Sequence, residues 1–461
     1  MKKKKRRDPS FSLPGVLVLA CAVGALTLFR LMVATGGAIT GEEALLEVCS
    51  AHPAGGYVEG PAGAPLLLFL LNAMGLSGLA VLRWIPSLAL LPMTWALWWI
   101  GCRIAPHRPS VALWSALLFN LLPPVNAAAL VMNGAVLVSL FPLLASVAGW
   151  RALLVPSGRL GAWLLFGAAL AVATLFDQWS GILLPAAFCA CFIRRGWMGI
   201  PWKGLAVAGA FLLLGWMPSL AWNLRHDWIQ WNGVAAAFDR ISILGHGIPL
   251  GTVLLTCAAV VPFLVLEAFS RRVLRVALIL IGVACAGVSG VILSAPGCLP
   301  AGIPSPLGVR GVGELAKAVR ELRSGRPDPK GGEPFLIAQT PGLAALLGAS
   351  LPGSYPERPG APSVFHAESP CLNSSFSLWP SYVDAVAAAV KDVLYTEEKS
   401  ASPFLGRNAL YITTEPREDL PQTITGAFSA VGLLAEVPVV IAGRNQIIRI
   451  YQCESYHSLA L

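Results

Sequence analysis

The stretch LPGVLVLACAVGALTLFRLMV, residues 13–33, decides the fold class. It is apolar over about 20 residues, the length that a helix needs to cross the hydrocarbon core of a membrane. A basic leader, residues 1–12, precedes it, and no clear small-x-small cleavage pattern follows it. We therefore expect an uncleaved first membrane helix rather than a signal peptide.

Further apolar runs extend this pattern along the chain. Of the 461 residues, 56% are hydrophobic and only 12% are charged, which is typical of a polytopic membrane protein and not of a soluble domain. The sequence predicts about nine membrane helices. They lie near residues 13–35, 84–102, 109–130, 134–150, 160–176, 179–194, 203–222, 250–269 and 273–294.

Basic residues predict the orientation of these helices. The leader, Arg103, Arg151, Arg194 and Arg271 occur at alternate turns, so a cytoplasmic amino terminus places all of them on one side. The net charge of +9 therefore reflects topology and does not indicate a nucleic-acid partner. The apolar segment 65–82 would split the basic clusters if it spanned, so we expect it to lie at the outer interface or to re-enter.

The composition divides the chain into three parts. Residues 1–12 are a cytoplasmic leader, residues 13–294 form the transmembrane domain with a first external loop at 36–83, and residues 295–461 form an external α/β domain. In that domain GELAKAVREL predicts an amphipathic helix, and PFLIAQ, NALYITT and QIIRIYQC predict strands. The cysteines that fall in polar segments are Cys49, Cys298, Cys371 and Cys453. The sequence leaves any disulfide pairing among them open.

The first external loop carries the carboxylates of interest. In AITGEEALLEVCSAHPAGGYVEGPAGAPLLL, residues 38–68, Glu42, Glu43 and Glu59 could act as a general base, as ligands of a divalent metal ion, or as solvated loop charges. In LRHDWIQW, Arg225 and His226 could contact a phosphate, although tryptophans at a helix end normally form an interfacial belt. The residues alone leave these alternatives open.

Motifs of soluble nucleotide and hydrolase chemistry are absent. The chain has no P-loop, no GxGxxG after a strand, no GxSxG and no HExxH. It also shows no internal repeat of the kind that many transporters contain.

Several of these segments together resemble the bacterial branch of the dolichyl-phosphate-mannose protein mannosyltransferase family, which includes the lipid A aminoarabinose transferases. EEALLEVCS at 42–50 is similar to the family's D-E-A-Y-Y-W-x-W-S. GYVEGPA at 56–62 is similar to G-Y-x-[DE]-K-P-P, and LRWIPS at 82–87 to V-R-x-P. PSLAWNLRHDW at 218–228 resembles P-x-x-x-W-N-x-x-H-D-W. The tail resembles the external domain of many bacterial members.

The resemblance implies a GT-C fold and a glycosyltransferase that works at the outer face of the bacterial cytoplasmic membrane. The donor would be a polyprenyl-phosphate sugar, and the acceptor a lipid, glycan or protein. Glu42 would act as base or metal contact, with Glu43 and Glu59 beside it and a divalent ion held by Glu42 and Glu59. Arg83, Arg225 and His226 would bind the donor phosphate.

Departures from the family pattern point to a second possibility. Gly60 and Gln178 stand where the family has phosphate-binding lysines, and Leu45–Leu46 stands where it has an aromatic pair. At the next external turn the family has an acid, and in this sequence Asn133 or Gly134 stands at that position. The alternative expectation is therefore a non-catalytic membrane scaffold or lipid-binding protein that keeps the fold.

Overall fold

The computed structural model describes residues 13–104, 109–132, 134–154, 160–230, 311–351, 360–368, 374–383, 403–441 and 444–457. The chain forms two compact units. We call residues 1–36, 54–56 and 60–294 the helical unit, and residues 37–53, 57–59 and 295–461 the sheet unit. The predicted spans 250–269 and 273–294, and Asn133, lie outside the described residues.

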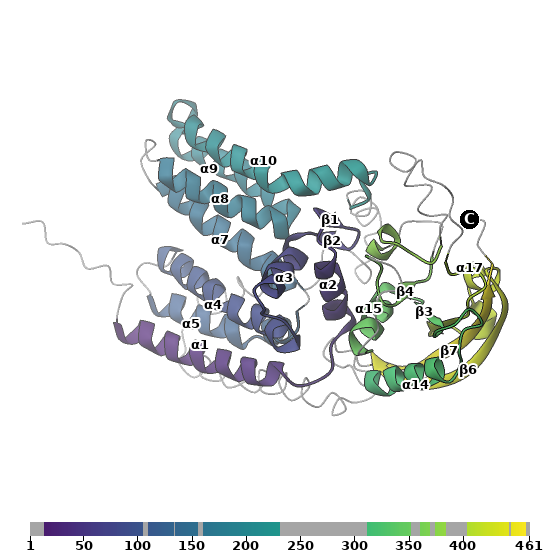
Figure 1. Cartoon of the computed structure of the whole chain (residues 1–461). Helices are drawn as coiled ribbons and strands as arrows, with labels where there is room; N and C mark the ends of the chain where they lie inside the picture. Colours follow the sequence, from purple (N-terminus) through teal and green to yellow (C-terminus); the bar gives the residue numbers. More distant parts are fainter. Residues whose placement is uncertain are drawn as a thin grey trace, which may run out of the picture. The chain divides into compact units, whose positions relative to one another are not determined.

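The helical unit is a set of apolar helices packed side by side (Figure 1). Helix α10 packs on α8, α8 on α7, α7 on α4, and α4 on both α1 and α5. Short 3-10 helices, η1 (Gln178–Ile182) and η2 (Trp197–Gly199), flank α9. The α-helices are α1 (Leu13–Ala34), α3 (Gly63–Ala73), α4 (Leu79–Ile104), α5 (Pro109–Leu121), α6 (Pro123–Leu130), α7 (Ala135–Leu154), α8 (Leu160–Phe176), α9 (Leu183–Arg195) and α10 (Trp202–Arg225).

Four of the described helices are long and apolar enough to cross a membrane: Gly15–Ala34, Leu79–Ile104, Val136–Leu154 and Trp202–Arg225. The prediction of about nine spans is therefore met only in part. The predicted span 109–130 is two helices, because Leu122 is extended at ψ 135° before Pro123. A residue that precedes proline is disfavoured from the helical conformation, so the helix ends there.

The segment 65–82 is likewise not one long helix. Helix α3 ends at Ala73, and Gly75 and Gly78 follow with φ values of +79° and +97° before α4 begins at Leu79. These positive φ values favour glycine, so the chain turns here. At 11 residues α3 is too short to span by itself. Its place at the outer interface or as a re-entrant segment stays a prediction.

A buried arginine stabilises the break between α5 and α6. Arg30 on α1 is only 1% exposed, and its guanidinium donates to the Asn120 carbonyl at 2.5 Å and to Asn126 Oδ1 at 2.8 Å. Asn126 Nδ2 also donates to the Asn120 carbonyl, at 3.0 Å. These donors satisfy a carbonyl that the interrupted helix leaves without its usual partner.

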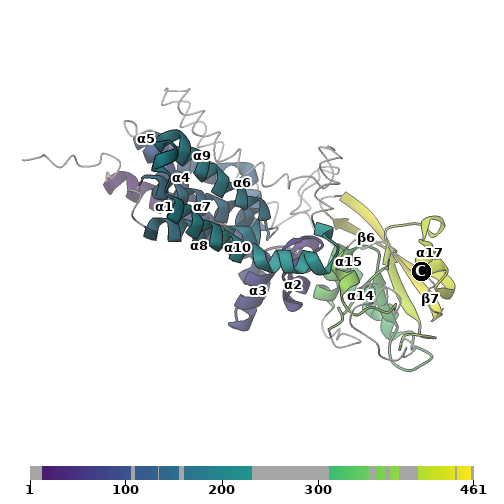
Figure 2. The ribbon, with the colours of Figure 1, turned by 90° about the horizontal axis from the view of Figure 1, so that it is seen from above.

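The sheet unit holds a mixed five-stranded sheet in the order β4-β3-β5-β7-β6. Strands β3 (Phe335–Ala338), β4 (Phe365–His366) and β5 (Ala409–Thr413) are parallel. Strands β6 (Phe428–Ile441) and β7 (Arg444–Tyr456) form the antiparallel side, and Figure 2 shows them side by side. The predicted α/β domain and the strands in PFLIAQ, NALYITT and QIIRIYQC are thus confirmed.

Two apolar cores cover the two faces of this sheet, because side chains alternate along each strand. Leu336 and Ile412 face the core that contains helices α14 (Val312–Ser324) and α15 (Pro341–Ser350). Phe335 and Tyr411 face the other core, with Tyr382, Phe404 and Tyr456. Helix α14 contains GELAKAVREL and confirms the predicted amphipathic helix. Cys49 and Cys453 are buried free thiols, whereas Cys298 and Cys371 lie outside the described residues.

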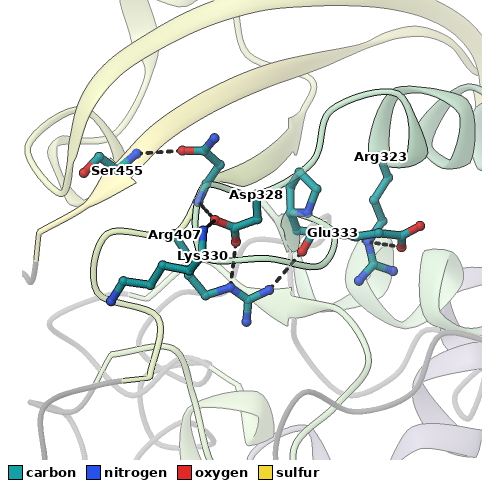
Figure 3. A network of polar contacts seen from close by, with 8 residues as sticks. Arg323, Asp328, Lys330, Glu333, Arg407 and Ser455 are labelled. Atoms are coloured by element: carbon teal, nitrogen blue, oxygen red, sulfur yellow. Dashed lines mark hydrogen bonds and ion pairs between the residues drawn. The ribbon is translucent and has the colours of Figure 1, made fainter.

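A buried ion pair joins the amino ends of β3 and β5 (Figure 3). Arg407 Nε lies 2.7 Å from Asp328 Oδ2, whose side chain is fully buried. Asp328 Oδ1 accepts the backbone N–H of Lys330 at 3.2 Å, and Arg407 also donates to the Glu333 carbonyl at 2.9 Å. The pair fixes the loop that leads into β3.

We expect Asp328→Ala to destabilise the protein by about 3 kcal/mol, because it leaves the largely buried Arg407 side chain without its carboxylate. The free energy of unfolding of the sheet unit, followed by circular dichroism in the full chain, measures this. Glu321→Ala is the control. It removes an exposed pair with Lys317, 3.8 Å apart, and should change stability by less than about 0.5 kcal/mol. Equal losses in both variants would contradict the assignment.

Candidate functional site

The acidic part of the first loop folds as a component of the sheet unit. Helix α2 (Gly41–Ala51) packs on α15, and its Ala44 is fully buried in the same core as Leu343 and Leu347. A Cβ on Gly41 would lie 3.4 Å from the Gly342 carbonyl oxygen, so the two helix starts are in close contact. Residues 37–53 are therefore not a free loop.

Glu43 starts this helix. It is fully buried, its Oε2 accepts the Thr40 N–H at 2.9 Å, and Thr40 Oγ1 accepts the Glu43 N–H at 3.2 Å. This reciprocal pair is a capping box, which satisfies two backbone donors at the helix start. The spacing T-x-x-E at Thr40–Glu43 is the sequence signal that could have identified this structural role.

Glu59 binds a serine of the distant tail. Its Oε1 accepts the Ser375 N–H at 2.9 Å, and its Oε2 accepts the Ser375 hydroxyl. The same hydroxyl lies 3.0 Å from the Val58 nitrogen. His52, at the end of α2, stacks on Trp379 with ring centroids 4.3 Å apart. Both Glu59 oxygens are thus engaged in holding residues 57–59 on the 3-10 helix η4 (Ser375–Leu378).

Glu42 differs from the other two predicted carboxylates. It is exposed, and no hydrogen bond joins its carboxylate to another described residue. Partial desolvation of the carboxyl and the neighbouring charge of Glu43 raise its pKa above the ordinary value of 4.5. A raised pKa beside an accessible face suits a group that exchanges protons. Within the described ranges, no three His, Cys, Asp or Glu side chains gather as a metal site would require.

The motif WNLRHDW forms the carboxyl-terminal cap of α10. The Asn223 carbonyl accepts the N–H groups of His226 at 3.1 Å and Trp228 at 3.0 Å. His226 stacks on Trp222 at 4.2 Å and its Nδ1 lies 2.7 Å from the Trp222 carbonyl. Asp227 and Trp228 have φ values of 50° and 58°, which non-glycine residues rarely adopt. The motif thus encodes a sharp, strained turn.

The predicted phosphate ligands occupy different environments. Arg83 is fully buried on α4 and donates to the carbonyl groups of Ala34 at 3.2 Å and Gly36 at 2.7 Å, so it caps α1. Arg225 is exposed on the last turn of α10, and His226 is half-buried. A phosphate-binding role for these three residues stays a prediction.

A hydrogen-bonded network joins the two positions at which the resemblance expects lysines. Gln178 Nε2 donates to Gln230 Oε1 at 3.0 Å, and Gln230 Nε2 donates to the Gly60 carbonyl at 2.7 Å. Ser219 and Asn223 of α10 complete the network, with Asn223 Nδ2 2.7 Å from Gln230 Oε1. We call Gln178, Ser219, Asn223 and Gln230 the amide network. Sequence reasoning singled out Gln178 but not its partners, which lie 41 and 52 positions away.

Comparisons with protein families, curated proteins and solved structures give no match to this chain.

Gly55 and Gly56 lie in close contact with α10 within the helical unit. A Cβ on Gly55 would lie 2.5 Å from the Pro218 carbonyl oxygen, and one on Gly56 would lie 3.1 Å from the Trp222 ring. Side chains do not fit at such distances. In contrast, a Cβ on Gly60 would meet no atom within 4 Å.

Gly55→Ala is therefore expected to destabilise the helical unit by about 2 kcal/mol, because the methyl group forces the segment away from α10. Gly60→Ala is the matched control and should stay within about 0.5 kcal/mol of the wild type. Thermal unfolding of the detergent-purified protein compares them. A Gly55→Ala variant as stable as Gly60→Ala would show that the contact does not hold this segment.

Proposed function

We propose that this protein is a membrane glycosyltransferase that moves a sugar from a polyprenyl-phosphate donor to an acceptor at the outer face of the bacterial cytoplasmic membrane. The proposal includes a GT-C-like membrane domain with about nine spans, a cytoplasmic amino terminus and an external sheet unit. It is supported by apolar helices in the first half of the chain.

The main support for the proposal is the exposure of Glu42 and the raised pKa of its carboxyl group. Glu43 and Glu59 are engaged in backbone contacts, whereas Glu42 is exposed with a raised pKa. In the proposed reaction the Glu42 carboxylate accepts the proton of an acceptor hydroxyl. The acceptor oxygen forms its bond to the anomeric carbon as the bond from that carbon to the phosphate oxygen breaks. The polyprenyl phosphate leaves with the electron pair.

A divalent ion held by Glu42 and Glu59 is not favoured by the residues present. Both oxygens of Glu59 accept hydrogen bonds from Ser375, which leaves Glu42 as the uncommitted carboxylate of the two. We derive no step through a metal ion.

Glu42→Gln should lower sugar transfer by about 100-fold or more, because the amide cannot accept the proton. The assay follows transfer from a polyprenyl-phosphate sugar in membranes that contain the full chain. Glu47→Gln is the control, since Glu47 lies on the same helix and its pKa is also raised by burial and by Glu43. Equal effects of the two variants would remove Glu42 from the reaction.

The rate of transfer should fall as the pH decreases through the Glu42 pKa, because only the ionised carboxylate is a base. Since the folded-state pKa is raised, this decline should begin above the ordinary value of 4.5. The pH dependence of kcat/KM measures it. An acid limb that is unchanged in Glu42→Gln variants with residual activity would assign the titration to another group.

A second candidate function is a non-catalytic, lipid-binding protein. The amide network favours it, because neutral side chains and a glycine stand where a donor phosphate would be expected to find cations. The absence of any sugar transfer by the wild-type protein, together with retained lipid binding, would select this candidate.

A further inference from the structure

The amide network has a defined hydrogen-bond polarity. Asn223 Nδ2 lies 2.8 Å from the Ser219 carbonyl, and Gln230 Nε2 lies 2.7 Å from the Gly60 carbonyl. A carbonyl oxygen only accepts, so each amide must turn its nitrogen toward it. The two backbone groups therefore fix both amides, and Gln230 Oε1 faces the donors of Gln178 and Asn223 at 3.0 and 2.7 Å.

This polarity leaves one buried acceptor unused. Asn223 is fully buried, and its Oδ1 has no hydrogen-bond donor among the described residues. Leaving a buried carbonyl oxygen without a donor costs free energy. A bound group that donates a hydrogen bond to this atom would remove that cost. A buried acceptor repels an anion and attracts a hydroxyl group.

The side chains of the network reinforce the same preference. Gln178, Ser219, Asn223 and Gln230 are all uncharged, and Gly60 contributes only its backbone. An ionised phosphate at this point would meet no cation within the network. An uncharged hydroxyl would complete the hydrogen bonds without bringing a charge.

The position of the network on α10 indicates an amphipathic ligand. Ser219 and Asn223 lie in the last two turns of a helix long and apolar enough to cross a membrane. Exposed apolar side chains cover the same helix: Leu213, Leu214, Met217 and Leu224. Trp228 follows the helix end and is exposed, as tryptophan often is at the interface between hydrocarbon and water.

We propose that the end of α10 binds a lipid with an uncharged, hydroxyl-bearing headgroup, and that a headgroup hydroxyl donates to Asn223 Oδ1. The role of this lipid as a substrate rests on the proposed transfer reaction. In that reaction the site binds the sugar part of the lipid and not its phosphate. Binding is measured without transfer, so the two proposals can fail separately.

The test compares four probes on the full-length protein in amphipol, which carries no sugar headgroup. Octyl glucoside, octyl phosphate, octanol and glucose separate the headgroup, its charge and the alkyl tail. We expect octyl glucoside, kept below its critical micelle concentration, to bind at least tenfold more tightly than each of the other three. Tighter binding of octyl phosphate, or no preference among the probes, would overturn the proposal and leave water as the occupant.

Two variants locate the binding. Asn223→Ala should weaken octyl glucoside binding at least tenfold, whereas the control Asn72→Ala, at an exposed position on α3, should leave it unchanged. Gly60→Lys adds an ammonium group where a Cβ meets no atom within 4 Å, and should favour octyl phosphate at least tenfold. Unchanged glucoside binding in Asn223→Ala would overturn the site. If that variant does not fold, the wild-type order of the probes decides.

Discussion

Carbonyl groups at helix ends have to find donors within the helical unit, because the apolar side chains around them offer none. Two buried arginines of this unit serve that task. Arg30 donates to the open carbonyl between α5 and α6, and Arg83 donates to the end of α1. Gln230 in turn donates to the carbonyl of Gly60, which lies outside the helices. Positive or polar residues among apolar helices are therefore not free to serve ligands until these backbone groups are satisfied.

Hydrogen-bond partners also distinguish the three carboxylates of the first loop, which belong to the sheet unit. Glu43 and Glu59 have backbone N–H groups as partners, so their carboxylates hold α2 and residues 57–59 in position. Glu42 sits between Gly41 and Glu43 in sequence, yet it has no such partner among the described residues. Acids that lie close together in the sequence thus differ in environment because of what each contacts, and not because of residue type.

Local patterns of the sequence predicted much of the fold. The apolar runs, the amphipathic helix of α14 and the strands β3, β5 and β7 follow from periodicity alone. The break after Leu122 also has a local cause, since two prolines follow it. The prediction missed this break because the residues around it are mostly apolar and read as one continuous span. The site was less predictable. Glu59 meets Ser375 across 316 positions, and no local pattern indicates such a partner. The short strand β4 has too few residues to show alternation.

The assignment of residues 37–53 and 57–59 to the sheet unit has a consequence for how the protein forms. Helix α2 is synthesised near the start of the chain, whereas its partner α15 appears only after the helices of the helical unit have been made. The apolar side of α2, with Ala44 and Val48, therefore waits for most of translation before it is covered. A chain whose synthesis stops within the helical unit would leave this side uncovered, because its partner helix has not yet been made.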